Sequence, residues 1–197
     1  LPHIPHRTTA PRESGLTMMM DKGLSWRQAE NFVDSCAHLT DLIKLGFGTS
    51  YVSTDLERKI EIYHKAGMKV YLGGTLFEAF IIRGMFDEYR ELLQKLNLST
   101  VEVSDGSIEL DHELKCRYIS ELSKDFTVLS EVGSKEEGIL ISPNKWINMM
   151  SSELEAGAWK VIAEARESGN VGIYRPNGTA HVALVNKIIA KVPSESI

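Results

Sequence analysis

Short apolar runs alternate with longer amphipathic runs along this chain, and this alternation constrains the fold more than any other feature. The apolar runs have the length and composition of strands and occupy residues 16–20, 39–45, 68–72, 100–103, 127–132 and 159–163. Stretches with helical spacing of apolar residues cover 26–37, 54–66, 76–96, 111–124, 143–156 and 182–191. Strands that alternate with helices predict an α/β fold with a parallel sheet.

Local signals support several of these helix boundaries. Ser25 and Thr54 are expected N-caps, because their side-chain oxygens can accept hydrogen bonds from the first helical turn. Pro143 fits the first turn of a helix, where its missing N–H is not needed. Gly67 is an expected helix stop, and Gly84 is expected to break the long stretch 76–96.

The spacing of the units narrows the choice of architecture. A polar residue near each strand end recurs about every 29 residues, close to the ~30 residues per unit of a (β/α)8 barrel of ~250 residues. The chain has 197 residues, and six such units are recognisable in it. This spacing leaves two architectures open, an open six-stranded sheet and a single barrel domain over residues 1–197 that is C-terminally incomplete.

Charged and glycine-rich residues follow the predicted strands far more often than they precede them. These residues are Asp21, Lys22, Lys44, Thr75, Glu78, Glu102, Asp105, Glu131, Lys135, Glu164, Arg166 and Glu167. In a parallel barrel all strand ends lie at one rim, where barrel enzymes build their active sites. The alternative interpretation is a set of buried salt bridges that stabilise the rim.

Carboxylates dominate the predicted strand ends, and histidines are scarce there. Glu102, Asp105, Glu131 and Glu164 are candidate ligands for a hard cation such as Mg²⁺, which prefers oxygen ligands together with substrate phosphate. The six histidines show no paired ligand spacing, and the two cysteines are isolated. We therefore expect Mg²⁺ rather than zinc.

Three lysines follow apolar segments and are candidates for a chemical role. Lys22, Lys44 and Lys135 could bind anions, or one could act as an acid, base or Schiff-base nucleophile. Glycine turns at 73–75 and 167–169 could present backbone N–H groups to an anion, although such turns are also common as tight loops.

Composition excludes several classes of function. The net charge of −5 argues against a protein that binds the phosphate backbone of nucleic acid. Neither a Walker motif nor a G-x-G-x-x-G fingerprint occurs, so no nucleotide cofactor is expected. No apolar run approaches the ~18 residues of a membrane span. Two isolated cysteines and the lack of an apolar signal core suggest a cytoplasmic protein.

The strand-end blocks, taken together, resemble those of the phosphosulfolactate synthase family. The blocks are Pro11-Arg12 with Gly15 and Thr17, Asp21-Lys22-Gly23, residues 44–50, residues 73–78, residues 102–106, Glu131-Val-Gly-Ser-Lys135 and residues 164–169. They occur in order over nearly the whole chain. The resemblance implies a (β/α)8 TIM-type barrel, and this is why we prefer a barrel whose last two units lie outside this chain.

The resemblance also implies a reaction, the Mg²⁺-dependent addition of sulfite to phosphoenolpyruvate to give (2R)-phospho-3-sulfolactate. This lyase-type step leads toward coenzyme M in archaea and toward sulfolactate in bacteria. Lys135 is implied as the acid that protonates the substrate carbon. We expect the other substrate contacts from Lys22, Lys44, Gly74, Thr75, Arg166, Ser168 and Gly169. A homo-oligomer such as a trimer is expected.

Two other hypotheses remain open. The resemblance also implies that the family includes plant heat-stress-associated proteins, which suggests a non-catalytic relative as one alternative. A Schiff-base barrel aldolase that uses Lys44 or Lys135 is the other, because one barrel fold supports many reactions.

Overall fold

The computed structural model describes residues 2–4, 6–133, 141–165 and 168–197. It divides into two compact units, Leu1–Leu72 and Gly73–Ile197, which are described in turn.

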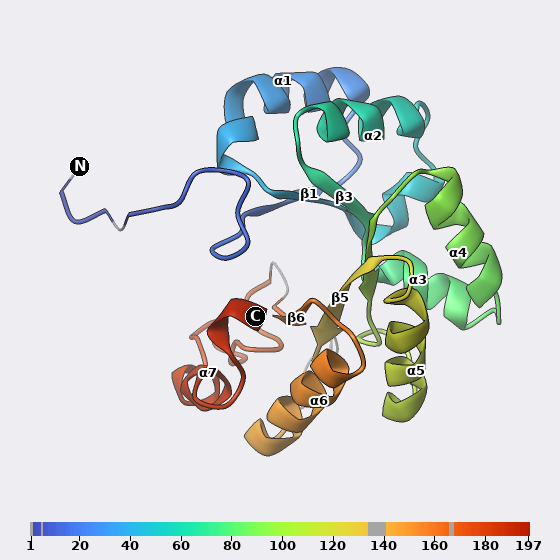
Figure 1. Cartoon of the computed structure of the whole chain (residues 1–197). Coiled ribbons are helices and arrows are strands. Elements are labelled where there is room, and N and C mark those ends of the chain that lie inside the picture. Colours follow the sequence, from blue (N-terminus) through green and yellow to red (C-terminus); the bar gives the residue numbers. More distant parts are fainter. Residues whose placement is uncertain (1, 5, 134–140, 166–167) are drawn as a thin grey trace. The chain divides into compact units, whose positions relative to one another are not determined.

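The first unit contains a parallel sheet with the strand order β1-β2-β3. Its strands are β1 (Met18–Asp21), β2 (Leu42–Leu45) and β3 (Lys69–Leu72). The helices α1 (Trp26–Cys36) and α2 (Leu56–Lys65) lie beside each other and cover this sheet (Figure 1). Two short 3₁₀ segments, η1 (Ala37–Leu39) and η2 (Gly46–Tyr51), flank β2.

The two faces of this sheet differ because successive side chains of a strand point in opposite directions. Asp21 contacts the hydroxyl of Tyr63 in α2, so its face of the sheet is the one that the helices cover. Lys44 occupies the alternate position in the paired register, level with Met20 and Tyr71. Lys44 is therefore directed to the face away from α1 and α2.

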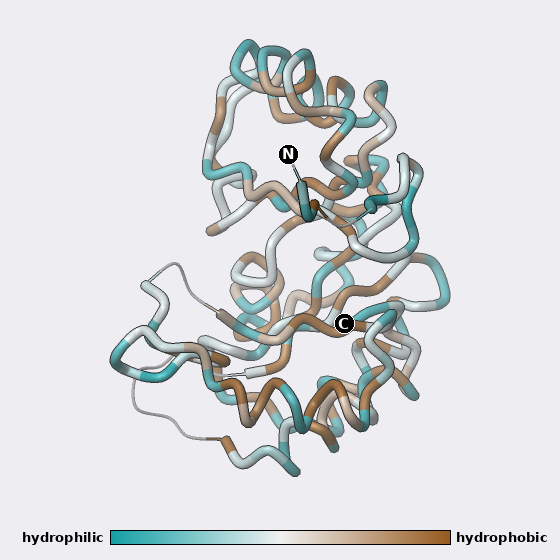
Figure 2. Tube along the Cα trace, turned by 90° about the vertical axis from the view of Figure 1, so that its left-hand side faces the viewer, coloured by the Kyte–Doolittle hydropathy of each residue, from teal (hydrophilic) through white to brown (hydrophobic). Residues whose placement is uncertain are grey.

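The second unit contains a parallel sheet with the strand order β4-β5-β6. The strands are β4 (Thr100–Val103), β5 (Thr127–Val132) and β6 (Lys160–Ala163). The helices are α3 (Gly74–Ile81), α4 (Phe86–Lys95), α5 (His112–Leu122), α6 (Pro143–Glu155) and α7 (Val182–Ile189), and a 3₁₀ segment, η3, covers Ser194–Ser196. Helices of this unit alternate between hydrophobic and hydrophilic stretches along the tube in Figure 2, as amphipathic helices do.

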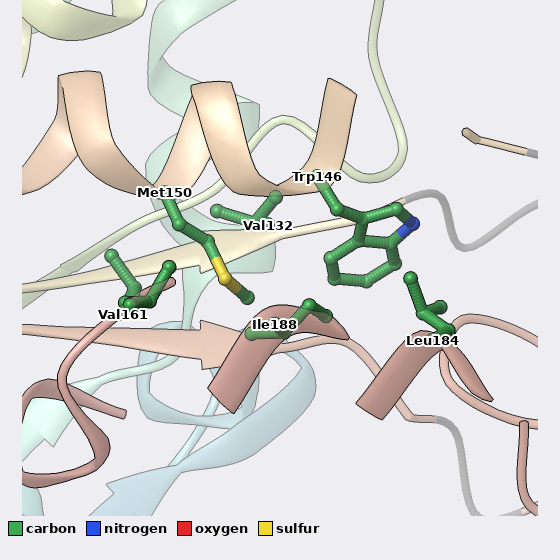
Figure 3. Packing of buried hydrophobic residues seen from close by; sticks show 7 residues of the cluster. Val132, Trp146, Met150, Val161, Leu184 and Ile188 are labelled. Atoms are coloured by element: carbon green, nitrogen blue, oxygen red, sulfur yellow. The ribbon is translucent and has the colours of Figure 1, made fainter. Parts of the chain in front are cut away.

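A hydrophobic cluster joins one face of this second sheet to α6 and α7. Val132 and Val161 come from the strands, and Trp146 and Met150 come from α6 (Figure 3). Leu184, Ile188 and Val192 complete the cluster. Because Val132 and Val161 belong to this helix-covered face, the alternate residues Glu131 and Ile162, which are paired in the register, lie on the opposite face.

The α/β class with parallel strands is confirmed, and so are most of the predicted elements. Ser25 is the N-cap of α1, Pro143 begins α6, and a left-handed Gly84 separates α3 from α4. The prediction for Thr54 is wrong, because Asp55 is the N-cap of α2 and has a φ of 54°. Among the described residues, no helix is both long enough and apolar enough to cross a membrane.

Candidate active site

Ser104, which directly follows β4, joins two buried carboxylates in the second unit. Its hydroxyl donates to Glu78 Oε1 at 2.6 Å and lies 3.0 Å from Glu131 Oε1. The backbone N–H of Ser107 donates to the same Glu78 oxygen at 3.3 Å. A hydroxyl group has only one proton to donate. Because its oxygen lies within hydrogen-bond distance of both carboxylates, Ser104 links a glutamate of α3 to a glutamate of β5.

Glu102 lies two residues before Ser104 and binds the beginning of α3. The N–H of Gly74 donates to Glu102 Oε1 at 2.6 Å. A carboxylate at this position is stabilised by the partial positive charge of a helix N-terminus. The close approach requires glycine, since a Cβ at position 74 would lie 2.3 Å from the Cβ of Ser104 and 2.7 Å from Glu102 Oε1.

Strand alternation explains why these groups come together. Glu102 and Ser104 are two residues apart and therefore share a face. The last registered pair of β4 and β5 is Val103 with Ser130, so Glu131 follows at the level of Ser104 on the same face. This is the face opposite the hydrophobic cluster of α6 and α7, and it corresponds to the strand-end polar surface that the sequence predicts.

The three glutamates of this cluster are deeply buried. Their exposed fractions are 2% for Glu78, 0% for Glu102 and 5% for Glu131. Burial raises the pKa of Tyr89 in α4, and the nearby negative charge of Glu102 raises it further. Buried carboxylates gathered in this way attract cationic groups, because charge is weakly screened away from water.

The donor chemistry of this cluster suits Mg²⁺. Carboxylate oxygens are the ligands that Mg²⁺ prefers, and proteins commonly hold it with one or two carboxylates while substrate phosphate and water complete the shell. Glu102 and Glu131 meet this requirement from neighbouring strands. Among the described residues, no three His, Cys, Asp or Glu side chains are arranged as a ready metal-binding group.

The other two predicted metal ligands lie at different places in this unit. Glu164 is buried directly after β6, with its carbonyl accepting the N–H of Ile173 at 3.0 Å. Asp105 is drawn to the helix side of the sheet, where its Oδ1 accepts a hydrogen bond from the ammonium group of Lys115 in α5 at 2.9 Å. Both positions remain predicted metal ligands.

The strand ends of the first unit are organised by Asp21, which is fully buried. Its Oδ1 accepts the N–H groups of Gly23 and Leu24, each at 2.8 Å. Its Oδ2 accepts Lys59 Nζ at 2.9 Å and the Tyr63 hydroxyl at 3.0 Å. Burial raises the pKa of Tyr63, and Asp21 raises it further. Asp21 therefore fixes the turn that carries Lys22.

Replacement of Asp21 by alanine is expected to destabilise the protein by about 3–5 kcal/mol, because it would leave the ammonium group of Lys59 buried without its counter-charge. Urea unfolding would measure this loss. Glu61→Ala is the matched control on the same helix, since Glu61 pairs with Lys65 at the exposed surface. That control should leave the free energy of unfolding essentially unchanged, and an equally small effect of Asp21→Ala would contradict the role of Asp21.

The predicted substrate-binding lysines of this unit have different surroundings. Lys22 is exposed, and its ammonium group lies 5.9 Å from the centroid of the Phe47 ring. Lys44 is 9% exposed within β2. Both lie at or near the C-terminal ends of strands, where the sequence places them.

The remaining predicted contacts are spread over the second unit. The N–H of Gly74 is already used by Glu102, whereas the neighbouring Thr75 is exposed. Ser168 is exposed and donates to Asn170, and Gly169 has a φ of 65°. The predicted acid Lys135 and the predicted anion-binding Arg166 lie outside the described residues.

A cavity of about 700 Å³ lies between the segment that leads into α5 and one side of α6. It is lined by Asp105, Leu110, Asp111, His112, Ser142, Asn144, Lys145, Asn148, Met149 and Ser152. The cavity shares Asp105 with the predicted strand-end set, but its other lining residues belong to the helix layer.

Glu78 and Ser104 are central to the described cluster, yet the sequence did not identify them as ligand-binding residues. Ser104 could have been found from its spacing, because it is two residues from Glu102 along a strand. Glu78 was among the charged residues that follow the predicted strands, but its contact with Ser104 depends on how α3 packs in the folded chain.

Solved structures with similar folds are TIM-barrel-like. 3-Hexulose-6-phosphate synthase matches with a TM-score of 0.54 at 15% identity, over 87% of this chain and 74% of that chain. A lysine-bound DHDPS from Cyanidioschyzon merolae matches with a TM-score of 0.53 at 12% identity, over 93% of this chain and 73% of that chain. At this identity the likeness concerns the fold alone.

Sequence comparison is far more specific. Phosphosulfolactate synthase of Bacillus subtilis (strain 168) is 34% identical over 189 residues, which covers 95% of this chain and 75% of the relative. That of Methanothermobacter thermautotrophicus is 35% identical over 199 residues, with coverages of 98% and 77%. That of Methanocaldococcus jannaschii is also 35% identical, with coverages of 93% and 79%. The profile of (2R)-phospho-3-sulfolactate synthase (ComA) matches residues 5–197, and this chain therefore belongs to that family.

Proposed function

We propose that this chain is a phosphosulfolactate synthase, which adds sulfite to phosphoenolpyruvate in a Mg²⁺-dependent reaction and forms (2R)-phospho-3-sulfolactate. The observation that carries the proposal is the family match over residues 5–197. The buried carboxylates of Glu78, Glu102 and Glu131 support it, because they supply oxygen ligands at strand ends.

In this proposal Glu102 and Glu131 hold Mg²⁺. The N–H of Gly74 keeps the Glu102 carboxylate in place, and the hydroxyl of Ser104 keeps the Glu131 carboxylate in place. Bound Mg²⁺ would stabilise negative charge that develops on the substrate carboxylate. Glu164 is a further candidate ligand. Asp105 is the weaker candidate, because its carboxylate is ion-paired with Lys115 on the helix side.

The chemical step forms one carbon–sulfur bond and one carbon–hydrogen bond. The sulfur lone pair of sulfite attacks the methylene carbon of phosphoenolpyruvate, and the electron pair of the double bond moves toward the carboxylate. A proton is then delivered to the carbon that bears the phosphate. Lys135 is the proposed donor, since a protonated lysine can act as a general acid.

The two substrates are anions and need cationic partners. The proposed partners are Lys22, Lys44 and Arg166, with Thr75, Ser168 and Gly169 as further hydrogen-bond donors.

The proposal includes a (β/α)8 barrel. The consecutive order of parallel strands within each sheet and the TIM-barrel-like structural neighbours support this architecture.

The proposal also includes a homo-oligomer, such as a trimer, in the cytoplasm. Exposed hydrophobic residues around η2 support assembly, since Phe47, Tyr51 and Val52 are 59%, 77% and 80% exposed. Analytical ultracentrifugation would test the oligomeric state.

Removal of divalent ions is expected to abolish activity. With phosphoenolpyruvate, sulfite and Mg²⁺, the purified protein should consume sulfite. An excess of EDTA should stop this consumption, and an excess of Mg²⁺ should restore it, because bound Mg²⁺ offsets charge that develops in the transition state. If sulfite is not consumed when Mg²⁺ is present and the protein is equimolar with the substrates, the proposed function is contradicted. Activity that is unaffected by EDTA would contradict the role of Mg²⁺.

A further inference from the structure

Lys115 is a fully buried lysine of α5 that the proposed chemistry does not use. Its ammonium group donates to Asp105 Oδ1 and contacts Glu153 Oε1, each at 2.9 Å. It also donates to the backbone carbonyl of Glu131 at 2.7 Å. These three acceptors match the three N–H bonds of an ammonium group.

The surroundings of Lys115 keep it charged. Burial by itself would lower the pKa of Lys115, but the carboxylates of Glu153 and Asp105 outweigh this effect and raise it above the ordinary value. Glu153 is also fully buried, and it contacts His112 Nε2 at 3.2 Å. Burial would raise the pKa of Glu153, but its contacts with His112 and Lys115 lower it. The pair is therefore a buried ion pair.

The hydrogen bond from Lys115 to the backbone carbonyl of Glu131 is not needed to balance these charges, but it lies beside the candidate site. The ladder between β4 and β5 ends at the pair Val103 and Ser130. The carbonyl of Glu131 follows directly, and Lys115 donates to it where the pairing of β5 with β4 stops, while the pairing of β5 with β6 continues to Val132. Asp105, the second acceptor, is the residue directly after Ser104. One ammonium group thus holds the chain at both Glu131 and the residue next to Ser104.

The side chains of those two segments meet on the other face of the sheet, where Ser104 Oγ lies 3.0 Å from Glu131 Oε1. We propose that Lys115 is a positioning residue: from the helix side it fixes the backbone at Glu131 and the loop at Asp105, so that Ser104 and the Glu131 carboxylate meet in the geometry that the reaction needs. This inference rests on the proposed function, because it assigns Glu131 to the site of that reaction.

A purely structural role is the competing explanation, and it has a different signature. Loss of one partner from a buried ion pair destabilises a protein strongly, whereas replacement of both partners by apolar residues is often neutral. Lys115→Met alone would leave Glu153 buried without its ammonium partner and is expected to unfold easily. The double variant K115M/E153L removes both charges, while Asp105 and His112 retain access to water because their side chains are 12% and 34% exposed.

The experiment compares K115M/E153L with wild type and with Glu153→Gln. Glu153→Gln keeps Lys115 and its bond to the carbonyl of Glu131, so it is the matched control for loss of the ion pair. A second double variant, K115L/E153Q, also removes both charges and the donor to the carbonyl of Glu131, so that either folded background decides the question. Urea unfolding, kcat and KM for phosphoenolpyruvate are measured for each. Binding of Mn²⁺ as a probe is measured from the electron paramagnetic resonance signal of the free ion.

We expect a folded double variant to have a urea midpoint near that of wild type, a kcat reduced about tenfold to a hundredfold, and a Kd for Mn²⁺ raised about tenfold, because a small misplacement of a catalytic group is costly. Glu153→Gln should lower the urea midpoint and keep kcat and the Kd for Mn²⁺ near wild type. A folded double variant with wild-type kcat and wild-type Mn²⁺ binding would overturn the positioning role.

The two measurements also separate this inference from the proposed function. A wild-type protein that binds Mn²⁺ but forms no product would contradict the proposed reaction, and the change in Mn²⁺ binding in the double variants would still decide the role of Lys115. A wild-type protein that neither binds Mn²⁺ nor forms product would contradict both.

Discussion

Replacement of Lys135 by alanine should lower kcat by about a hundredfold to ten-thousandfold, the range typical of a lost general acid. The variant should still bind phosphoenolpyruvate with a KM close to that of wild type if the other cationic groups provide most of the binding. Circular dichroism and urea unfolding would show that the fold is retained, and steady-state kinetics would measure the loss.

Lys135→Arg separates proton donation from charge. Arginine retains the positive charge but holds its proton too tightly to serve as an acid. We expect this variant to keep the KM for phosphoenolpyruvate and to lose kcat almost as severely as Lys135→Ala. Lys145→Ala, at an exposed position in α6, is a control for the loss of a surface lysine and should keep full activity. Normal turnover in a folded Lys135→Ala protein would show that another group supplies the proton.

Replacement of Gly74 by alanine should damage both stability and activity. The new methyl group would lie 2.3 Å from the Cβ of Ser104 and 2.7 Å from Glu102 Oε1, so both residues must move. Overpacking of this kind costs about 1–3 kcal/mol of folding free energy. Displacement of the Glu102 carboxylate and the Ser104 hydroxyl should lower kcat/KM by about a hundredfold.

Gly46→Ala is the matched control for Gly74→Ala. Its Cβ would approach a flexible side chain, with Met20 Cγ at 2.9 Å, and Met20 can move aside. We expect a small loss of stability and nearly full activity in the control. Urea unfolding and kcat/KM for phosphoenolpyruvate test both variants, and a Gly74→Ala protein as active as Gly46→Ala would show that Gly74 is not a point of close packing in the site.

Element positions could be predicted because they depend on local signals. The predicted strand 127–132 coincides with β5, and the break at Gly84 follows from the left-handed backbone that glycine adopts readily. The boundary of α2 was missed by one residue, because Thr54 and Asp55 are both favourable N-cap residue types and the local sequence does not choose between them.

The candidate site could be predicted only in part. Charged residues at strand ends pointed to Glu102 and Glu131, and strand alternation brings them to one face. The position of Asp105 on the helix side could also have been suspected, because it is an odd number of residues from Glu102. The hydrogen bond between Ser104 and Glu78 joins distant parts of the chain and has no local signal.

Lys115 shows why buried charges are difficult to predict from a sequence. A lysine in an amphipathic helix is normally assigned to the solvated face. Here Lys115, Ile119 and Leu122 are all buried, and their spacing places the lysine on the apolar stripe of α5. That spacing was a usable signal, but its acceptors, two carboxylates and the carbonyl of Glu131, come together only in the folded protein.

If this protein joins sulfite to phosphoenolpyruvate and protonates the neighbouring carbon, the product formed with Mg²⁺ in deuterated water identifies both steps. Mass spectrometry and ³¹P nuclear magnetic resonance of that product should show (2R)-phospho-3-sulfolactate that retains its phosphate ester and carries one deuterium at the phosphate-bearing carbon. Unchanged phosphoenolpyruvate, or pyruvate and free phosphate without a carbon–sulfur bond, would contradict this reaction.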